Sequence, residues 1–174
     1  MMGIPGPRKA ERATGKALTH FLYLLIPTLR AGGESLKMKV YFIRGDMDFG
    51  KTSACRKLRE KLIDKNFSEL CYGALEWEND FYSVFNIGDK KVGIYSAGDY
   101  GSILREALKF GANNNCDIFI CPVRTNIKYN KPINDCLTQG KDTWEWIYMP
   151  SFDTEDERVR NAENLAQQLF ELIS

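Results

Sequence analysis

The feature that most constrains the fold is a short apolar segment that leads through a glycine-bounded loop into an amphipathic segment. Lys39–Arg44 (KVYFIR) is rich in β-branched and aromatic residues, which favours a strand. Lys51–Asp64 carries apolar residues at roughly helical spacing, so it is predicted to be a helix. Residues 45–52 join the two segments and contain glycines that permit a tight turn. The sequence thus predicts a strand, a turn and a helix in direct succession, an arrangement typical of α/β domains.

Predicted strands and helices continue to alternate through the rest of residues 38–174. Two apolar stretches separated by a polar turn indicate a hairpin. Thr154 and Glu157 form the capping-box pattern that starts a C-terminal helix, and Gly111 is expected to end an earlier helix. The further expected elements are the hairpin strands 81–87 and 92–95, the strands 118–123 and 146–149, and the helices 103–110 and 133–137. This alternation predicts one α/β domain with three layers and a mainly parallel sheet.

Residues 45–52 match the phosphate-binding pattern G-x-x-x-x-G-K-[ST]. Gly45 and Gly50 accept backbone conformations that other residues resist, so the loop can turn its N–H groups inward as an anion nest. Lys51 is expected to bring its charge to the β and γ phosphates, and Thr52 to offer its hydroxyl to Mg²⁺. The residues predicted to contact the nucleotide are Gly45, Asp46, Met47, Asp48, Phe49, Gly50, Lys51, Thr52 and Ser53.

Two features of this loop are unusual for an anion site. Asp46 and Asp48 place acidic side chains beside the expected phosphates, so we expect their carboxylates to point outward. Phe49 is bulkier than the small residue expected before the second glycine. A simple strand-to-helix turn followed by an exposed lysine is the alternative interpretation of the same residues.

The stretch YFIRGDMDFGKT resembles the P-loop NTPase superfamily, and the resemblance covers the chain from Met38 onward. It implies a P-loop NTPase-like topology, binding of ATP or GTP with Mg²⁺, and an acidic residue that ends a second strand. The part GDMDFGKT is also similar to the phosphate loop of thymidine kinases, although the chain lacks their paired-cysteine zinc pattern.

Asp99 is the candidate for the second acidic residue that the resemblance implies. It lies in the run IYSAGD, just after the predicted strand 92–95, and is expected to orient Mg²⁺ or water. Ser96 sits nearer the end of that strand and is a candidate outer ligand of Mg²⁺, whereas a helix cap or a solvated turn is the alternative role of Asp99. Asp117 precedes its strand and is expected at the opposite edge of the sheet, because ligands bind at the carboxyl ends of parallel strands.

Arg124 follows the predicted strand 118–123 and should therefore lie at the same edge as the glycine-rich loop. It is a candidate contact to phosphate or to a second substrate, with a surface salt bridge as the alternative. Residues 130–133 begin like the guanine-specific pattern N-K-x-D but lack its aspartate. We therefore expect ATP in preference to GTP.

Residues 1–37 differ in composition from residues 38–174, because they are basic whereas the remainder is slightly acidic. Basic residues precede the short apolar run 21–27, a layout typical of signal or transit peptides. We nevertheless expect either a true start at Met38 or an N-terminal helix over residues 8–29, in preference to export.

The overall composition narrows the range of partners. A net charge of +1 gives no indication of binding to nucleic acid or to a membrane. Five cysteines with one histidine and no C-x-x-C pattern predict reduced thiols in the cytoplasm and no zinc site.

Three functions agree with these features. The first is an ATPase or regulatory NTPase that uses Lys51, Mg²⁺ bound to Thr52 and Asp99, and Arg124. The second is a kinase for a small metabolite or nucleotide, although no arginine-rich lid is visible in the sequence. The third is an interaction module that binds nucleotide without hydrolysing it.

Overall fold

The computed structural model describes residues 37–76, 79–126 and 128–174. Apart from Lys37, the N-terminal extension 1–37 considered above therefore lies outside the described residues. The domain proposed from Met38 onward falls within them, with short gaps at 77–78 and 127.

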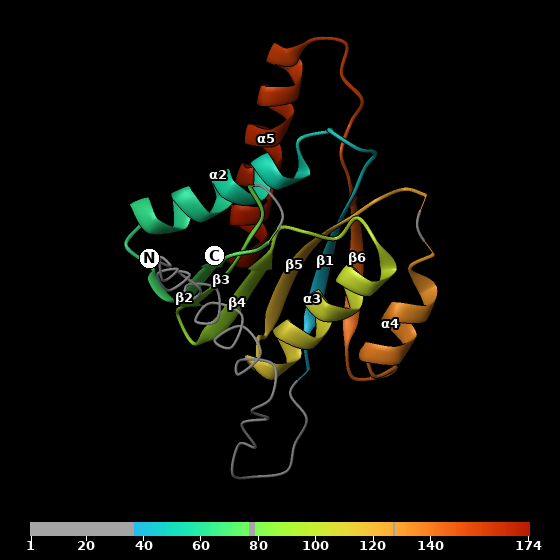
Figure 1. Ribbon diagram of the computed structural model, residues 1–174. Coiled ribbons are helices and arrows are strands. Elements are labelled where there is room, and N and C mark those ends of the chain that lie inside the picture. Colours follow the sequence, from blue (N-terminus) through green and yellow to red (C-terminus); the bar gives the residue numbers. More distant parts are fainter. Residues whose placement is uncertain (1–36, 77–78, 127) are drawn as a thin grey trace, which may run out of the picture.

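A six-stranded sheet with helices on both faces forms the body of the protein (Figure 1). Four neighbouring strands of this sheet are parallel, and one strand near its edge is antiparallel to both of its neighbours. The order across the sheet is β2 (Ser68–Ala74), β3 (Phe81–Ile87), β4 (Lys90–Tyr95), β5 (Ile118–Val123), β1 (Lys39–Arg44) and β6 (Thr143–Tyr148). The antiparallel strand is β3, and the expected α/β fold with a mainly parallel sheet is confirmed.

Helices cover the two faces of the sheet as separate pairs (Figure 1). α2 (Lys51–Asp64) packs with α5 (Glu155–Ile173) on one face, and α3 (Gly101–Asn113) with α4 (Asn130–Cys136) on the other. Successive side chains of a strand point to opposite faces, so β1 contributes Ile43 to the first core and Phe42 to the second. The three layers expected from the sequence are therefore present. None of the helices in the described ranges combines the length and apolarity that a membrane span requires.

Local patterns predicted most elements correctly, but Gly111 was wrongly expected to end a helix. α3 continues through Gly111 to Asn113. An added Cβ at Gly111 would lie 2.7 Å from the ring of Phe119, so glycine is needed there for close packing of α3 on the sheet.

Three further differences lie at the edges of the domain. β2 was not expected, because it lacks an apolar run and pairs only with β3. β6 begins at Thr143, three residues before the predicted start, because the edge of the sheet extends along β1 as far as Lys39. α4 begins at Asn130, and Pro132 lies in its first turn, where the missing N–H costs no helical hydrogen bond.

The strand order brings several loops together at one edge of the sheet. β1 and β5 are neighbours, yet α2 follows β1 on one face and α4 follows β5 on the other. Ligands of α/β proteins bind in the crevice at such a point, beyond the carboxyl ends of the strands. Because β3 is antiparallel to β4, its first residue lies at this edge as well: Ser96 N–H donates to the Phe81 carbonyl over 2.9 Å.

Candidate functional site

Residues 45–52, here called the glycine loop, turn sharply between β1 and α2. Gly50 has a φ of 85° and Asp48 a φ of 61°, so both adopt the left-handed conformation. Glycine takes this conformation without strain, and aspartate tolerates it better than most residues do. No hydrogen bond from a side chain of the described residues caps α2, so the N–H groups of its first turn remain available to an anion. These two left-handed residues and the uncapped start of α2 agree with the loop conformation that the sequence predicts.

Two of the three unusual side chains of the glycine loop, those of Asp46 and Phe49, contact neighbouring segments. The Asp46 carboxylate accepts a hydrogen bond from the Thr125 hydroxyl in the segment after β5. The ring of Phe49 packs edge-on against Phe152, with 5.4 Å between the ring centroids. Phe49 thus joins the loop to the segment between β6 and α5, which explains why a bulky residue fits before Gly50. Asp48, in contrast, lines the cavity described below.

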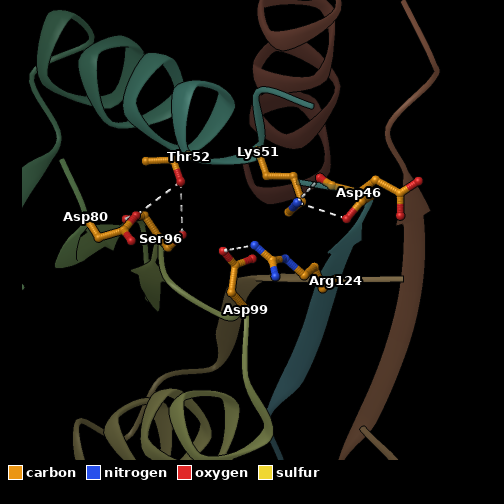
Figure 2. A network of polar contacts seen from close by, with 8 residues as sticks. Asp46, Lys51, Thr52, Asp80, Ser96, Asp99 and Arg124 are labelled. Carbon is orange, nitrogen blue, oxygen red and sulfur yellow. Dashed lines mark hydrogen bonds and ion pairs between the residues drawn. The ribbon is translucent and has the colours of Figure 1, made fainter. Parts of the chain in front are cut away.

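Lys51 is buried, with 6% of its surface exposed, and its ammonium group turns back over the glycine loop (Figure 2). Its Nζ donates to the carbonyl of Gly45 over 2.9 Å and to the carbonyl of Asp46. Burial lowers the pKa of Lys51, and the charge of Asp99 opposes this shift. Within the described part of the chain this desolvated ammonium donates only to neutral carbonyls, which an anion could replace.

Thr52, the next residue, faces a different group of atoms (Figure 2). Its hydroxyl lies 3.1 Å from Asp80 Oδ1 and 3.4 Å from the Ser96 carbonyl, and its single proton can be donated to either oxygen. The Ser96 hydroxyl donates to the same Asp80 Oδ1 over 2.8 Å and accepts from the Phe81 N–H over 2.8 Å. The result is a compact set of oxygen atoms at the start of α2.

Arg124 and Asp99 form an ion pair below Lys51 (Figure 2). The distance between Arg124 Nη2 and Asp99 Oδ2 is 3.4 Å, which is long for a charged hydrogen bond. The side chain of Arg124 is only 15% exposed, and its Nε has no hydrogen-bond partner among the described residues. Both groups are close enough to affect Lys51, whose pKa is lowered by Arg124 and raised by Asp99. Arg124 is therefore a largely buried guanidinium with unused donors.

A cavity of about 430 Å³ opens over the start of α2. Residues 47–53 of the glycine loop and α2 line it, as do Asp80 and residues 96–100. Of the residues predicted from the sequence, Met47 to Ser53 and Asp99 thus share one cavity, whereas Gly45, Asp46 and Arg124 are outside its lining.

Gly98 fixes the position of the loop that carries Ser96 and Asp99. A Cβ added at Gly98 would lie 1.7 Å from the Pro122 carbonyl, so only glycine allows this loop to approach β5 so closely. This close contact holds residues 96–100 in place as one wall of the cavity, across from Lys51 and Thr52.

Sequence reasoning missed three charged residues that line the cavity: Asp80, Arg56 and Arg158. The sequence did contain a signal for Asp80, which comes just before the first strand of the predicted hairpin. That strand runs opposite to the second one, so it begins at the edge where the second strand and its parallel neighbour end. Arg56 and Arg158 depend on how α2 and α5 pack, for which the sequence contains no local signal.

Asp117 lies at the opposite edge of the sheet, as the sequence predicts. Asp117 accepts a hydrogen bond from the Lys91 N–H over 2.7 Å at the start of β4, far from the carboxyl ends of the strands. All five cysteines are free thiols. Within residues 37–76, 79–126 and 128–174, no group of three or more histidine, cysteine or acidic side chains is arranged to hold a metal ion.

No protein-family model matches the chain, and comparison with curated proteins and with solved structures gives no significant match. The chemistry of the cavity therefore has to be inferred from its own residues.

Proposed function

We propose that the protein binds a nucleoside triphosphate with Mg²⁺, with ATP preferred to GTP, and hydrolyses it slowly. The observation that supports this proposal most directly is the buried Lys51 ammonium at the uncapped start of α2, where residues 47–53 line a cavity. The negatively charged oxygens of a polyphosphate would pair with the N–H groups of the glycine loop and with the Lys51 ammonium. The resemblance of residues 45–52 to a P-loop gives the same expectation.

In this proposal Lys51 leaves the carbonyls of Gly45 and Asp46 and binds the β and γ phosphates. Nothing else among the described residues pairs with its ammonium, so the exchange breaks only the two hydrogen bonds to those carbonyls. The N–H groups of the glycine loop and of the first turn of α2 bind the remaining phosphate oxygens.

Arg124 is proposed to bind the terminal phosphate. Its Nε is buried without a hydrogen-bond partner among the described residues, and its only ion pair is long. A phosphate oxygen would satisfy these donors better than Asp99 does at 3.4 Å. Asp99, released from Arg124, remains a candidate for positioning the attacking water.

The oxygen atoms beside Thr52 fit Mg²⁺, which prefers hydroxyl, carbonyl and carboxylate ligands. When bound, Mg²⁺ neutralises charge on the β and γ phosphate oxygens. Thr52 would hold the cation through its hydroxyl oxygen, since that oxygen lies at the start of α2, next to the nest.

Base preference is proposed from the segment after β5. Residues 130–133 lack the aspartate of the guanine-specific pattern, and they form the first turn of α4 rather than a loop. Without that aspartate a guanine base would lose its characteristic hydrogen bonds, which favours ATP.

Phosphoryl transfer to a small anionic acceptor is the second candidate function. Arg56 and Arg158 line the same cavity, one from α2 and the other from α5. Two such guanidinium groups would attract a phosphate or carboxylate on a second substrate. ADP formation that depends on an added acceptor would favour this function over simple hydrolysis.

Calorimetric titration of ATP and GTP in the presence of Mg²⁺ tests the proposal. The wild type should bind ATP more tightly than GTP, and Lys51→Ala should lose most of the affinity. Lys57→Ala is the matched control, because Lys57 lies on the same helix and pairs with Glu163 on α5. Failure of the wild type to bind either nucleotide would reject the proposal. Tight binding without ADP release would reject hydrolysis and leave an interaction module.

A further inference from the structure

Of the three aspartates that line the cavity, Asp80 lies one residue before β3 and Asp99 lies four residues after β4, and the surroundings of these two differ. Asp99 already forms an ion pair with Arg124 and also lies near Lys51. Asp80 accepts hydrogen bonds from the hydroxyls of Thr52 and Ser96, and no lysine or arginine of the described residues forms an ion pair with it. A divalent cation would therefore be repelled by the two cationic groups near Asp99, whereas no ion pair with a described residue neutralises the charge of Asp80.

From this difference we infer that Asp80, and not Asp99, supplies the carboxylate of the Mg²⁺ site beside Thr52. The inference rests on the proposed function, because the cation is expected to bind together with a nucleotide. The carboxylate of the proposed Mg²⁺ site would then come from Asp80, directly before the antiparallel strand β3.

The distances between the oxygen atoms agree with this assignment. Octahedral Mg²⁺ binds its ligands at about 2.1 Å, which places neighbouring ligand atoms about 3 Å apart. The Thr52 hydroxyl lies 3.1 Å from Asp80 Oδ1, and the Ser96 hydroxyl lies 2.8 Å from the same atom. The Thr52 proton has a second acceptor in the Ser96 carbonyl at 3.4 Å. Thr52 can therefore turn its proton away and present its lone pairs to a cation that Asp80 also approaches.

The hairpin holds Asp80 in this position. The Phe81 N–H donates to the Ser96 hydroxyl over 2.8 Å, and the Ser96 N–H donates to the Phe81 carbonyl over 2.9 Å. These bonds fix the start of β3 beside the end of β4, and Ser96 itself is buried. The carboxylate is thus anchored by backbone pairing, as a preorganised metal site requires.

Titration of ATP into four proteins, once with excess Mg²⁺ and once with EDTA, tests the inference. In the wild type, Mg²⁺ should tighten binding. Asp80→Asn should reduce this Mg²⁺-dependent gain by about 10- to 100-fold and leave the affinity in EDTA nearly unchanged. Asp99→Asn, the matched control on the other side of the cavity, should retain the gain, and Lys51→Ala should lose affinity under both conditions.

A second readout does not depend on turnover. Mn²⁺ can replace Mg²⁺, and its electron paramagnetic resonance signal reports how much of it is bound in the presence of ADP. Bound Mn²⁺ should be lost in Asp80→Asn, largely restored in Asp80→Glu, which keeps the charge, and present in Asp99→Asn.

Each contrary outcome has a distinct meaning. If Asp99→Asn loses the Mg²⁺-dependent gain and Asp80→Asn keeps it, the assignment is overturned while the proposed function stands. If Asp80→Asn weakens binding equally with Mg²⁺ and with EDTA, or Asp80→Glu restores nothing, Asp80 acts only in the structure of the hairpin and the inference fails. If the wild type binds no nucleotide, the proposed function itself is rejected.

Discussion

Lys51 and Thr52 are adjacent in the chain, but the groups around them differ in charge. We call these two groups the Lys51 side and the Thr52 side of the glycine loop. On the Lys51 side, the ammonium donates to two neutral carbonyls, and Arg124 Nε has no hydrogen-bond partner among the described residues; both side chains are poorly exposed to water. On the Thr52 side, hydroxyl, carbonyl and carboxylate oxygens gather around Asp80. Successive residues of a helix project about 100° apart, so the first turn of α2 can face both groups at once. One helix start can thereby separate a site for an anion from a site for a cation.

Gly98→Ala should have the largest effect on stability and on nucleotide binding. The loop that contains Gly98 carries Ser96 on the Thr52 side and Asp99 on the Lys51 side. The new Cβ would lie 1.7 Å from the Pro122 carbonyl, so the loop with Ser96 and Asp99 must move. We expect a loss of about 3 kcal/mol in the free energy of unfolding, measured by urea denaturation, together with weaker nucleotide binding. Gly101→Ala is the control: its Cβ would meet only ordinary contacts at 3.6 Å, and its stability should be close to that of the wild type.

Removing one side at a time should separate the two chemistries. Lys51→Ala should weaken ATP binding by about 100-fold with or without Mg²⁺, because a hydrogen bond to a charged group contributes up to about 3 kcal/mol. Thr52→Ala should weaken binding only when Mg²⁺ is present. Calorimetry with Mg²⁺ and with EDTA distinguishes the two patterns, and identical behaviour of the two variants would mean that the sides are not separate.

Raising the pH should affect only the Lys51 side. Burial lowers the pKa of Lys51, so its charge is lost at a lower pH than that of an exposed lysine. Above this pKa in the free protein, binding of ATP must take up a proton, and the affinity should fall by up to about tenfold per pH unit. Lys51→Arg should bind ATP without this alkaline decline, since arginine stays charged. An equal decline in both proteins would show that another group titrates.

The smallest expected effect is that of Asp99→Asn on nucleotide affinity. Loss of the carboxylate frees Arg124 and removes a negative charge near the expected phosphates. Because Asp99 is 44% exposed, solvent screens it, and the gain should be only about threefold in ATP affinity. Weaker binding in calorimetry would instead indicate that Asp99 contributes directly to the site.

The sequence was sufficient for the parts of the site that are local in the chain. β1, the glycine loop and α2 follow one another, and their patterns predicted the bounds of both elements correctly. The hairpin, β5 and the capping box of α5 were also predicted, since each has a strong local signature.

What the sequence did not reveal depends on contacts between distant segments. Asp80 reaches Thr52 only because β3 pairs antiparallel with β4, and Gly98 is explained only by the carbonyl of Pro122. β2 has no continuous apolar run, because an edge strand has one exposed side. The predicted hairpin indicates at which edge Asp80 lies, but its contact with Thr52 and the other features follow from strand order and packing, for which a single sequence provides no direct signal.

The central place of β1 in the sheet affects when this strand can pair during synthesis of the chain. Its two neighbours, β5 and β6, both come much later in the chain, with Lys39 opposite Ile118 and Thr143. At a synthesis rate of about 5–20 residues per second, the roughly 80 residues before β5 keep both edges of β1 unpaired for about 4 to 16 seconds. A nascent chain would carry an apolar strand with open hydrogen-bonding edges throughout that interval, a state that invites aggregation. Early chaperone contact, centred on Lys39–Arg44, would therefore matter more for this protein than for one whose central strand pairs with its sequence neighbours.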